Sequence, residues 1–145
     1  MRVSRQFGVP AVRVFDAWVD PLVACKFLFA TPGGEMLRTQ IDARVGGSFH
    51  IVEKRNGTPV EHIGIFLELT RPRRISFLFR VPYYSPESTR VSIGVLAMES
   101  GCEVVVSHEG VAEEMADRTE EGWQAILQGL EGVLAERAFP TASVA

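Results

Sequence analysis

Three histidines are the side chains of this chain that titrate closest to neutral pH. His50, His62 and His108 lie on separate predicted strands, where each imidazole could act as an acid, a base or a metal ligand. A metal site would need two or three such ligands to converge, and these positions neither require nor exclude that. Because no spacing typical of a metal motif accompanies them, we predict no metal site.

Glu61 and Tyr83 add two further candidates for acid–base chemistry. Glu61 alternates in phase with Ile63 and Ile65, which predicts that it faces the interior near the start of a strand. The alternative is an edge position that reaches water. Tyr83 lies in an aromatic loop, where it could offer a hydroxyl to a ligand or cap one end of the core. With His108, these are the candidate catalytic residues, although nothing in their spacing resembles a triad or a phosphate loop.

The composition narrows the class of protein. The chain has 145 residues, 46% of them hydrophobic, and a net charge of −3, which fits one domain with a sizeable core and argues against nucleic acid as the main partner. No apolar run is long enough to cross a membrane. Cys25 and Cys102 show neither a disulfide framework nor a metal-binding spacing. We therefore expect a cytoplasmic protein without a cofactor.

The elements that must position these side chains follow from the hydrophobic pattern. After a first strand over 2–8, Pro10 suits the first turn of a helix. Asp20 then caps a second short helix that begins at Pro21. The apolar period changes to two from residue 37. The remaining strands are predicted over 37–44, 47–54, 60–70, 73–82, 88–98 and 102–110.

Short links between these strands predict an antiparallel sheet, with a tight hairpin at Asn56-Gly57. A long helix follows, from Glu113 or Thr119 to Arg137. One of its stripes is apolar and consists of Trp123, Ile126, Leu127, Leu130, Val133 and Leu134. Another contains Gly122, Ala125, Gly129 and Gly132. The glycines either allow close packing of the helix backbone or leave space for a ligand beside it.

The order of these elements resembles the helix-grip fold of the START/Bet v 1-like (SRPBCC) superfamily. More narrowly, the chain is similar to the domain named after the activator of the heat-shock protein 90 ATPase. The resemblance covers about residues 5–136. It is carried by the motifs Val9-Pro10, Val14-Phe15, Trp18–Pro21, Asp42–Phe49, Gly64–Leu69, Arg71–Ile75, Ser107–Gly110 and Gly122-Trp123. It implies an α+β fold with a curved antiparallel sheet of about seven strands around a long C-terminal helix, and two short helices after the first strand.

The same resemblance implies a hydrophobic cavity between the sheet and the last helix. The side chains expected to bind a ligand there are Trp18, Phe27, Phe49, Ile65, Phe77, Phe79, Trp123, Ile126, Leu127 and Leu130. We expect a single domain over 1–137 and a flexible tail over 138–145. Relatives include carriers, cyclases and co-chaperone domains, and many bacterial members stand alone. Fold therefore does not decide function.

Three hypotheses follow for what the chain does. The first is a non-enzymatic domain that binds a small apolar or aromatic ligand. The second is an enzyme of the cyclase or dehydratase type that uses polar cavity residues. The third is a protein-interaction module, either co-chaperone-like or a homodimer. Polar side chains that meet inside the cavity would favour catalysis, whereas an entirely apolar lining would favour binding.

Overall fold

A computed structural model describes the backbone of residues 1–144 and the side chains of residues 1–135. Seven strands form one antiparallel sheet in the order β1-β7-β6-β5-β4-β3-β2. The strands are β1 (Arg2–Phe7), β2 (Glu35–Ile41), β3 (Ser48–Arg55), β4 (Thr58–Thr70), β5 (Arg74–Arg80), β6 (Thr89–Met98) and β7 (Gly101–Glu109). The helices are α1 (Ala11–Val19), α2 (Pro21–Ala24), the short η1 (Glu113–Met115) and α3 (Ala116–Val144). The predicted fold class is confirmed.

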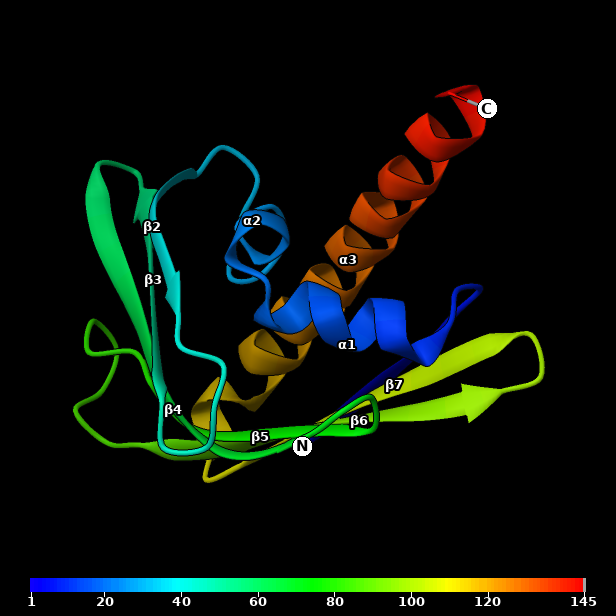
Figure 1. The fold of residues 1–145 in the computed structure, drawn as a ribbon. Helices are drawn as coiled ribbons and strands as arrows, with labels where there is room; N and C mark the ends of the chain where they lie inside the picture. Colours follow the sequence, from blue (N-terminus) through cyan, green and yellow to red (C-terminus); the bar gives the residue numbers. More distant parts are fainter. Residues whose placement is uncertain (145) are drawn as a thin grey trace.

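The sheet curves around the helices. Figure 1 shows β2 and β3 bending upward from the plane of β5, β6 and β7, with α1, α2 and the first half of α3 on the concave side. The concave face carries the core because alternate strand residues point toward the helices. Within the residues described, no helix is long and apolar enough to span a membrane.

Local sequence explains where the elements begin and turn. The side chain of Asp20 accepts a hydrogen bond from the backbone N–H of Leu22 at 3.0 Å, and Pro21 opens α2. At the β3–β4 turn, Asn56 and Gly57 have φ values of 50° and 81°, a conformation that glycine and asparagine adopt most readily. The predicted cap and hairpin are both confirmed.

Helix α3 packs by its predicted apolar stripe, whose six members are all buried. The glycine stripe does not border a cavity. A Cβ on Gly129 would lie 3.4 Å from the Cβ of Phe27, and around Gly122 and Gly132 nothing lies within 4 Å. Gly129 therefore lies beside Phe27 at a distance that leaves room for a Cβ in ordinary van der Waals contact, while the other two glycines are exposed. The helix extends beyond the boundary predicted at 137, and the flexibility predicted for 138–145 falls on residues whose side chains the structure does not describe.

Candidate functional site

A small apolar pocket lies on the concave face of the sheet. Its volume is about 10 Å³, enough for roughly one water molecule. It is lined by Trp18, Leu28, Ile41, Phe49, Phe66, Ile75, Phe77 and Ile93. None of these side chains is ionisable, so the pocket offers water few partners. One polar atom among them is notable: Nε1 of Trp18 is buried without a hydrogen-bond partner among the described residues.

Side chains of the chain itself fill most of the interior. Phe27, Leu28 and Phe29 follow α2 in sequence and are all buried. Phe27 packs edge-on against Trp18 with ring centroids 5.3 Å apart, and Phe29 stacks on Phe79 at 5.0 Å. The segment that connects α2 to β2 therefore occupies the volume between the sheet and α3.

Nine of the ten side chains predicted to bind a ligand are buried in this interior. Trp18, Phe49 and Phe77 line the pocket directly. The tenth, Ile65, is 46% exposed on the outer face of the sheet, so the prediction that it faces inward is wrong. The inward positions of this part of β4 are His62, Gly64 and Phe66. Gly64 is required there because a Cβ would collide with the ring of Phe49.

His108 is buried in a complete chain of hydrogen bonds. Its Nδ1 accepts from Trp123 Nε1 at 3.0 Å, and its Nε2 lies 2.7 Å from Oγ1 of Thr89. The Thr89 hydroxyl in turn donates to the carbonyl of Phe79. This pattern assigns the proton of a neutral ring to Nε2. Burial lowers the pKa of His108 to about 4, and the positive amino group of Met1 adds to that effect.

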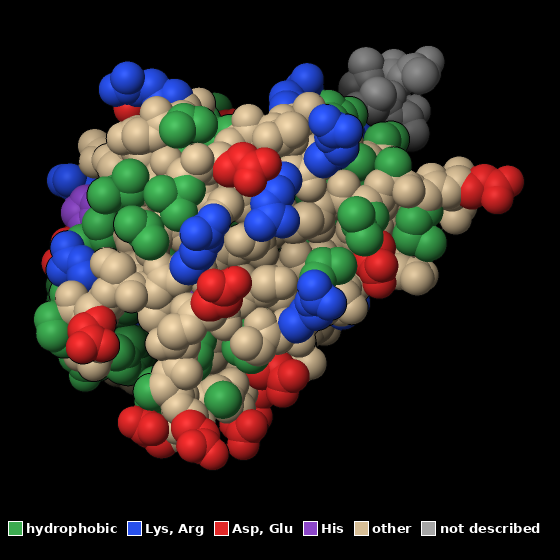
Figure 2. Space-filling view, turned by 90° about the horizontal axis from the view of Figure 1, so that it is seen from below, with side chains coloured by type: hydrophobic (Ala, Val, Ile, Leu, Met, Phe, Trp, Pro, Cys, Tyr) green, Lys and Arg blue, Asp and Glu red, His purple; other side chains and the backbone are tan. Residues whose placement is uncertain are grey.

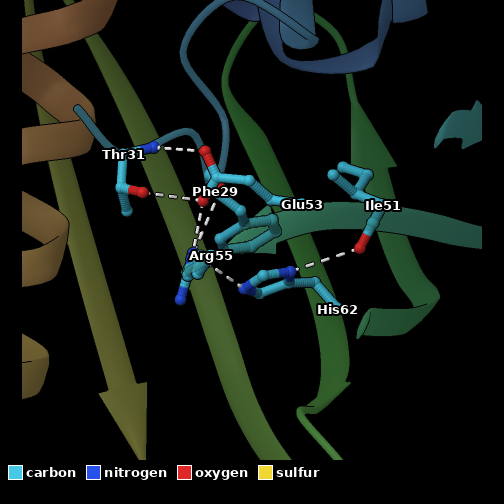
Figure 3. A network of polar contacts seen from close by, with 6 residues as sticks. All are labelled: Phe29, Thr31, Ile51, Glu53, Arg55 and His62. Atoms are coloured by element: carbon cyan, nitrogen blue, oxygen red, sulfur yellow. Dashed lines mark hydrogen bonds and ion pairs between the residues drawn. The ribbon is translucent and has the colours of Figure 1, made fainter. Parts of the chain in front are cut away.

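A second polar network joins β3, β4 and the α2–β2 segment (Figure 3). Glu53 is 1% exposed. Its carboxylate accepts hydrogen bonds from the backbone N–H of Thr31 at 2.6 Å, the Thr31 hydroxyl at 2.9 Å and Nε of Arg55 at 2.6 Å. The guanidinium of Arg55 also donates to the carbonyl of Phe29 at 3.2 Å. The network fastens the segment to the sheet.

His62 completes this network as a neutral ring. Nδ1 of His62 lies 3.2 Å from the carbonyl of Ile51, and Nε2 lies 3.3 Å from the guanidinium of Arg55. A proton on Nδ1 satisfies both contacts, because Nε2 then accepts from Arg55. Burial is the main cause that lowers the pKa of His62 to about 4, followed by the charge of Arg55. The spacing of Phe49, Ile51 and Glu53 on β3 was the sequence signal for an inward carboxylate there, and it was missed.

The three candidate catalytic residues do not meet. Glu61 is exposed on the outer face, where it lies 2.7 Å from Nε2 of His50, so the alternative of a position that reaches water is confirmed and the inward orientation is wrong. Tyr83 is 63% exposed in the loop between β5 and β6. His108 is buried with both ring nitrogens occupied by protein partners. No group of three or more residues that could hold a metal ion occurs in the described part of the chain.

The outer face of the sheet carries exposed apolar side chains. Ile65 on β4 is paired in register with Leu78 on β5, and both are exposed together with Leu67. In Figure 2, hydrophobic side chains form separate clusters on both sides of the visible face, with charged side chains of both signs between them.

Comparison with known proteins agrees with this architecture. Residues 8–135 match the family model described as Activator of Hsp90 ATPase homolog 1-like protein. The crystal structure of protein CV1439 from Chromobacterium violaceum is similar, with a TM-score of 0.81, 26% identity, and coverage of 92% of this chain and 94% of that chain. No curated protein sequence matches.

Two further solved structures share the fold at lower identity. The AHSA1-like protein from Aeromonas hydrophila has a TM-score of 0.81 at 19% identity, covering 95% of this chain and 94% of that chain. An HSP90 activator from Plasmodium falciparum has a TM-score of 0.74 at 18% identity, covering 93% and 95%. At these identities the similarity concerns the fold alone.

Proposed function

The chain belongs to the family of activator of Hsp90 ATPase homolog 1-like proteins, and we propose that it is a non-catalytic domain that binds a small, largely apolar molecule on the concave face of the sheet. The observation that carries this proposal is the pocket. All eight of its lining residues are apolar or aromatic. Trp18, one of them, buries an N–H without a partner among the described residues. An unsatisfied buried donor is costly, and a ligand acceptor that reached this N–H would offset the cost.

The present pocket volume sets a condition on this function. About 10 Å³ does not hold an aromatic molecule, so binding must displace side chains that now fill the interior. Leu28 is the lining residue best placed to move, because it lies in the segment outside regular helix and strand between α2 and β2. The ligand would then replace apolar contacts that the protein makes with itself. We therefore expect modest affinity that rises when this segment is loosened or trimmed.

A thermal-shift titration tests the proposal. With 2-methoxynaphthalene at 100 times its Kd, the free energy of unfolding should rise by about 2.7 kcal/mol, visible as a higher Tm. In Leu28→Ala the vacated space should tighten binding by about tenfold. The matched control is Leu130→Ala, which removes an equally buried side chain that does not line the pocket. The proposal fails if the wild type and L28A show no ligand-dependent shift, or if L130A gains affinity as much as L28A.

The acid–base alternative has weaker support. A cyclase or dehydratase needs an acid or base that reaches the ligand, whereas His108 is saturated by Trp123 and Thr89. Glu61 and Tyr83 lie outside the interior.

A second candidate function is self-association through the outer face of the sheet. Ile65, Leu67 and Leu78 expose apolar surface there, and cross-strand neighbours of both charge signs, Arg90 and Glu109, flank it. An isologous dimer places the same patch on both subunits and pairs opposite charges across a two-fold axis.

Sedimentation velocity checks this second candidate. We expect a concentration-dependent dimer of the wild type that Ile65→Lys abolishes, because a buried unpaired charge opposes association. A wild type that remains monomeric at submillimolar concentration would eliminate the homodimer.

A further inference from the structure

Phe29 is held in a backbone conformation that its side chain disfavours. Its φ is 57°, in the left-handed region where a bulky residue other than glycine is an outlier. Such conformations persist only where surrounding contacts fix them, and they cluster at ligand sites. Phe29 lies in the segment between α2 and β2, which supplies the pocket with Leu28. The contacts that fix Phe29 therefore indicate which chemical groups fit this part of the interior.

The ring of Phe29 lies flat on a platform of two other rings. It stacks on His62 with ring centroids 4.5 Å apart and planes 4° apart, and on Phe79 at 5.0 Å and 11°. The rings of His62 and Phe79 are themselves nearly parallel, at 15°, with centroids 6.3 Å apart. Both belong to the inner face of the sheet and are buried. The platform accepts a flat aromatic ring.

The carbonyl of Phe29 has its own partner beside this platform. The guanidinium of Arg55 donates to it at 3.2 Å, while Nε of Arg55 is occupied by the buried carboxylate of Glu53 (Figure 3). Since Glu53 already balances the positive charge, a second carboxylate would meet a negative neighbour. The position beside Arg55 therefore suits a neutral acceptor. In Phe29 two carbon atoms, Cβ and Cα, separate the ring from this carbonyl.

We propose that the ring and the carbonyl of Phe29 occupy positions that a ligand takes when it binds. The platform of His62 and Phe79, with Arg55 beside it, then binds an aromatic ring joined through two carbons to a neutral carbonyl. The chemical class is that of 3-arylpropanoyl amides, esters and ketones. None of the platform residues lines the pocket, but Phe29 also stacks on the pocket residue Phe49 with ring centroids 6.2 Å apart. This inference therefore rests on the proposed function, extends it to the adjoining part of the interior and names a ligand class. Ligand entry displaces Phe29, releases its unfavourable backbone conformation and leaves the Glu53–Arg55 pair in place.

Two hydrogen bonds from Thr31 to Glu53 oppose the displacement of Phe29. Thr31 follows Phe29 by two residues and donates its backbone N–H and its hydroxyl to Glu53. A hydrogen bond to a charged acceptor is stronger than one to a neutral acceptor. Thr31→Ala should therefore raise the population of the open form, in which the α2–β2 segment is released from Glu53. A ligand that binds only the open form gains apparent affinity in proportion to that population. Thr31 thus controls binding from outside the ligand contacts.

Four matched probes test the class by isothermal titration calorimetry on the wild type and on Thr31→Ala. The probes are 3-phenylpropanamide, propylbenzene, which lacks the carbonyl, 3-phenylpropanoate, which carries a charge, and 3-cyclohexylpropanamide, which lacks the aromatic ring. The amide should bind at least about tenfold more tightly than each of the others, and T31A should strengthen amide binding by about tenfold. Amide hydrogen exchange should show faster exchange of the Thr31 N–H when the amide is bound, because Thr31 leaves Glu53.

The outcomes separate this inference from the proposed function. If propylbenzene binds as tightly as 3-phenylpropanamide, the role of Arg55 is wrong, while an apolar binding site remains. Amide binding without faster exchange at Thr31 places the ligand elsewhere and overturns the inference. If none of the four probes binds either protein, the inference is also overturned, and the titration with 2-methoxynaphthalene then decides whether the interior binds any ligand.

Discussion

Replacing Arg55 with methionine is expected to lower the free energy of unfolding by about 3–5 kcal/mol, because it leaves a buried carboxylate without its cation. Glu53 is 1% exposed and lies 2.6 Å from Nε of Arg55. Its two remaining hydrogen bonds come from Thr31 and do not neutralise it. Urea denaturation at neutral pH measures the difference directly.

Two controls distinguish this burial effect from the loss of an ion pair in general. Arg44→Met breaks the pair between Arg44 and Asp42, whose nitrogen–oxygen distance is 2.8 Å with both side chains exposed, and should cost less than about 1 kcal/mol. Replacing Glu53 and Arg55 together with apolar residues should recover most of the stability that the single change removes. Equal losses in R55M and R44M would contradict the account of Glu53 as a buried, charge-balanced anchor.

Acidification from pH 7 to pH 5 should destabilise the protein by several kcal/mol through two buried histidines. The pKa values of His62 and His108 are lowered from 6.5 to about 4 in the folded state, so the unfolded chain takes up protons that the folded chain does not. The contribution of the two neutral histidines to the free energy of unfolding is fully present above pH 6.5. It falls as the pH drops toward 4, by about 1.4 kcal/mol per pH unit for each histidine. At pH 5 the combined loss is about 4 kcal/mol.

Denaturation curves of His62→Gln and His108→Gln at pH 7 and pH 5 measure how much of this loss of stability comes from each histidine. Each variant should lose about half of the difference between pH 7 and pH 5, whatever its stability at pH 7. His50→Gln is the surface comparison, because His50 lies on the outer face beside Glu61, and it should retain the full difference. A wild type whose stability is the same at pH 7 and pH 5 would show that neither ring is kept neutral by the fold.

Most of the fold could be predicted from the sequence because its signals are local. Alternation of apolar residues placed each strand within a few residues of its bounds. The turn residues Asn56 and Gly57 identified the tightest hairpin, and the spacing from Trp123 to Leu134 identified the buried side of α3. Each of these patterns depends on the backbone geometry of a single element. None requires knowledge of what lies across the core.

The orientation of β4 could not be predicted in the same way. Both of its faces are apolar, since Ile63 and Ile65 lie outside while Phe66 lies inside, and the register with β5 shifts between Phe66 and Glu68. Gly64 faces inward under the ring of Phe49, which alternation alone does not reveal. These facts depend on contacts between strands, so Glu61 and Ile65 were assigned to the wrong face.

For the same reason, only part of the candidate site could be predicted from the sequence. Aromatic residues on the strands predicted an apolar interior, and most of them are there. The position of Phe29 on the rings of His62 and Phe79 depends on a single residue with positive φ and on a carboxylate that fixes the segment two residues later. No periodic pattern encodes such a contact.

The most direct measurement of the central claim is an isotope-filtered NMR experiment with 2-methoxynaphthalene and the ¹³C-labelled wild-type protein. Ile75 and Ile93 line the pocket and are buried, whereas Ile65 and Leu78 lie exposed on the outer face. If the interior is the binding site, nuclear Overhauser effects will connect the ligand with the methyl groups of Ile75 and Ile93. Contacts restricted to Ile65 and Leu78, or no contacts at all, would contradict the claim that this protein binds its ligand in the pocket on the concave face of the sheet.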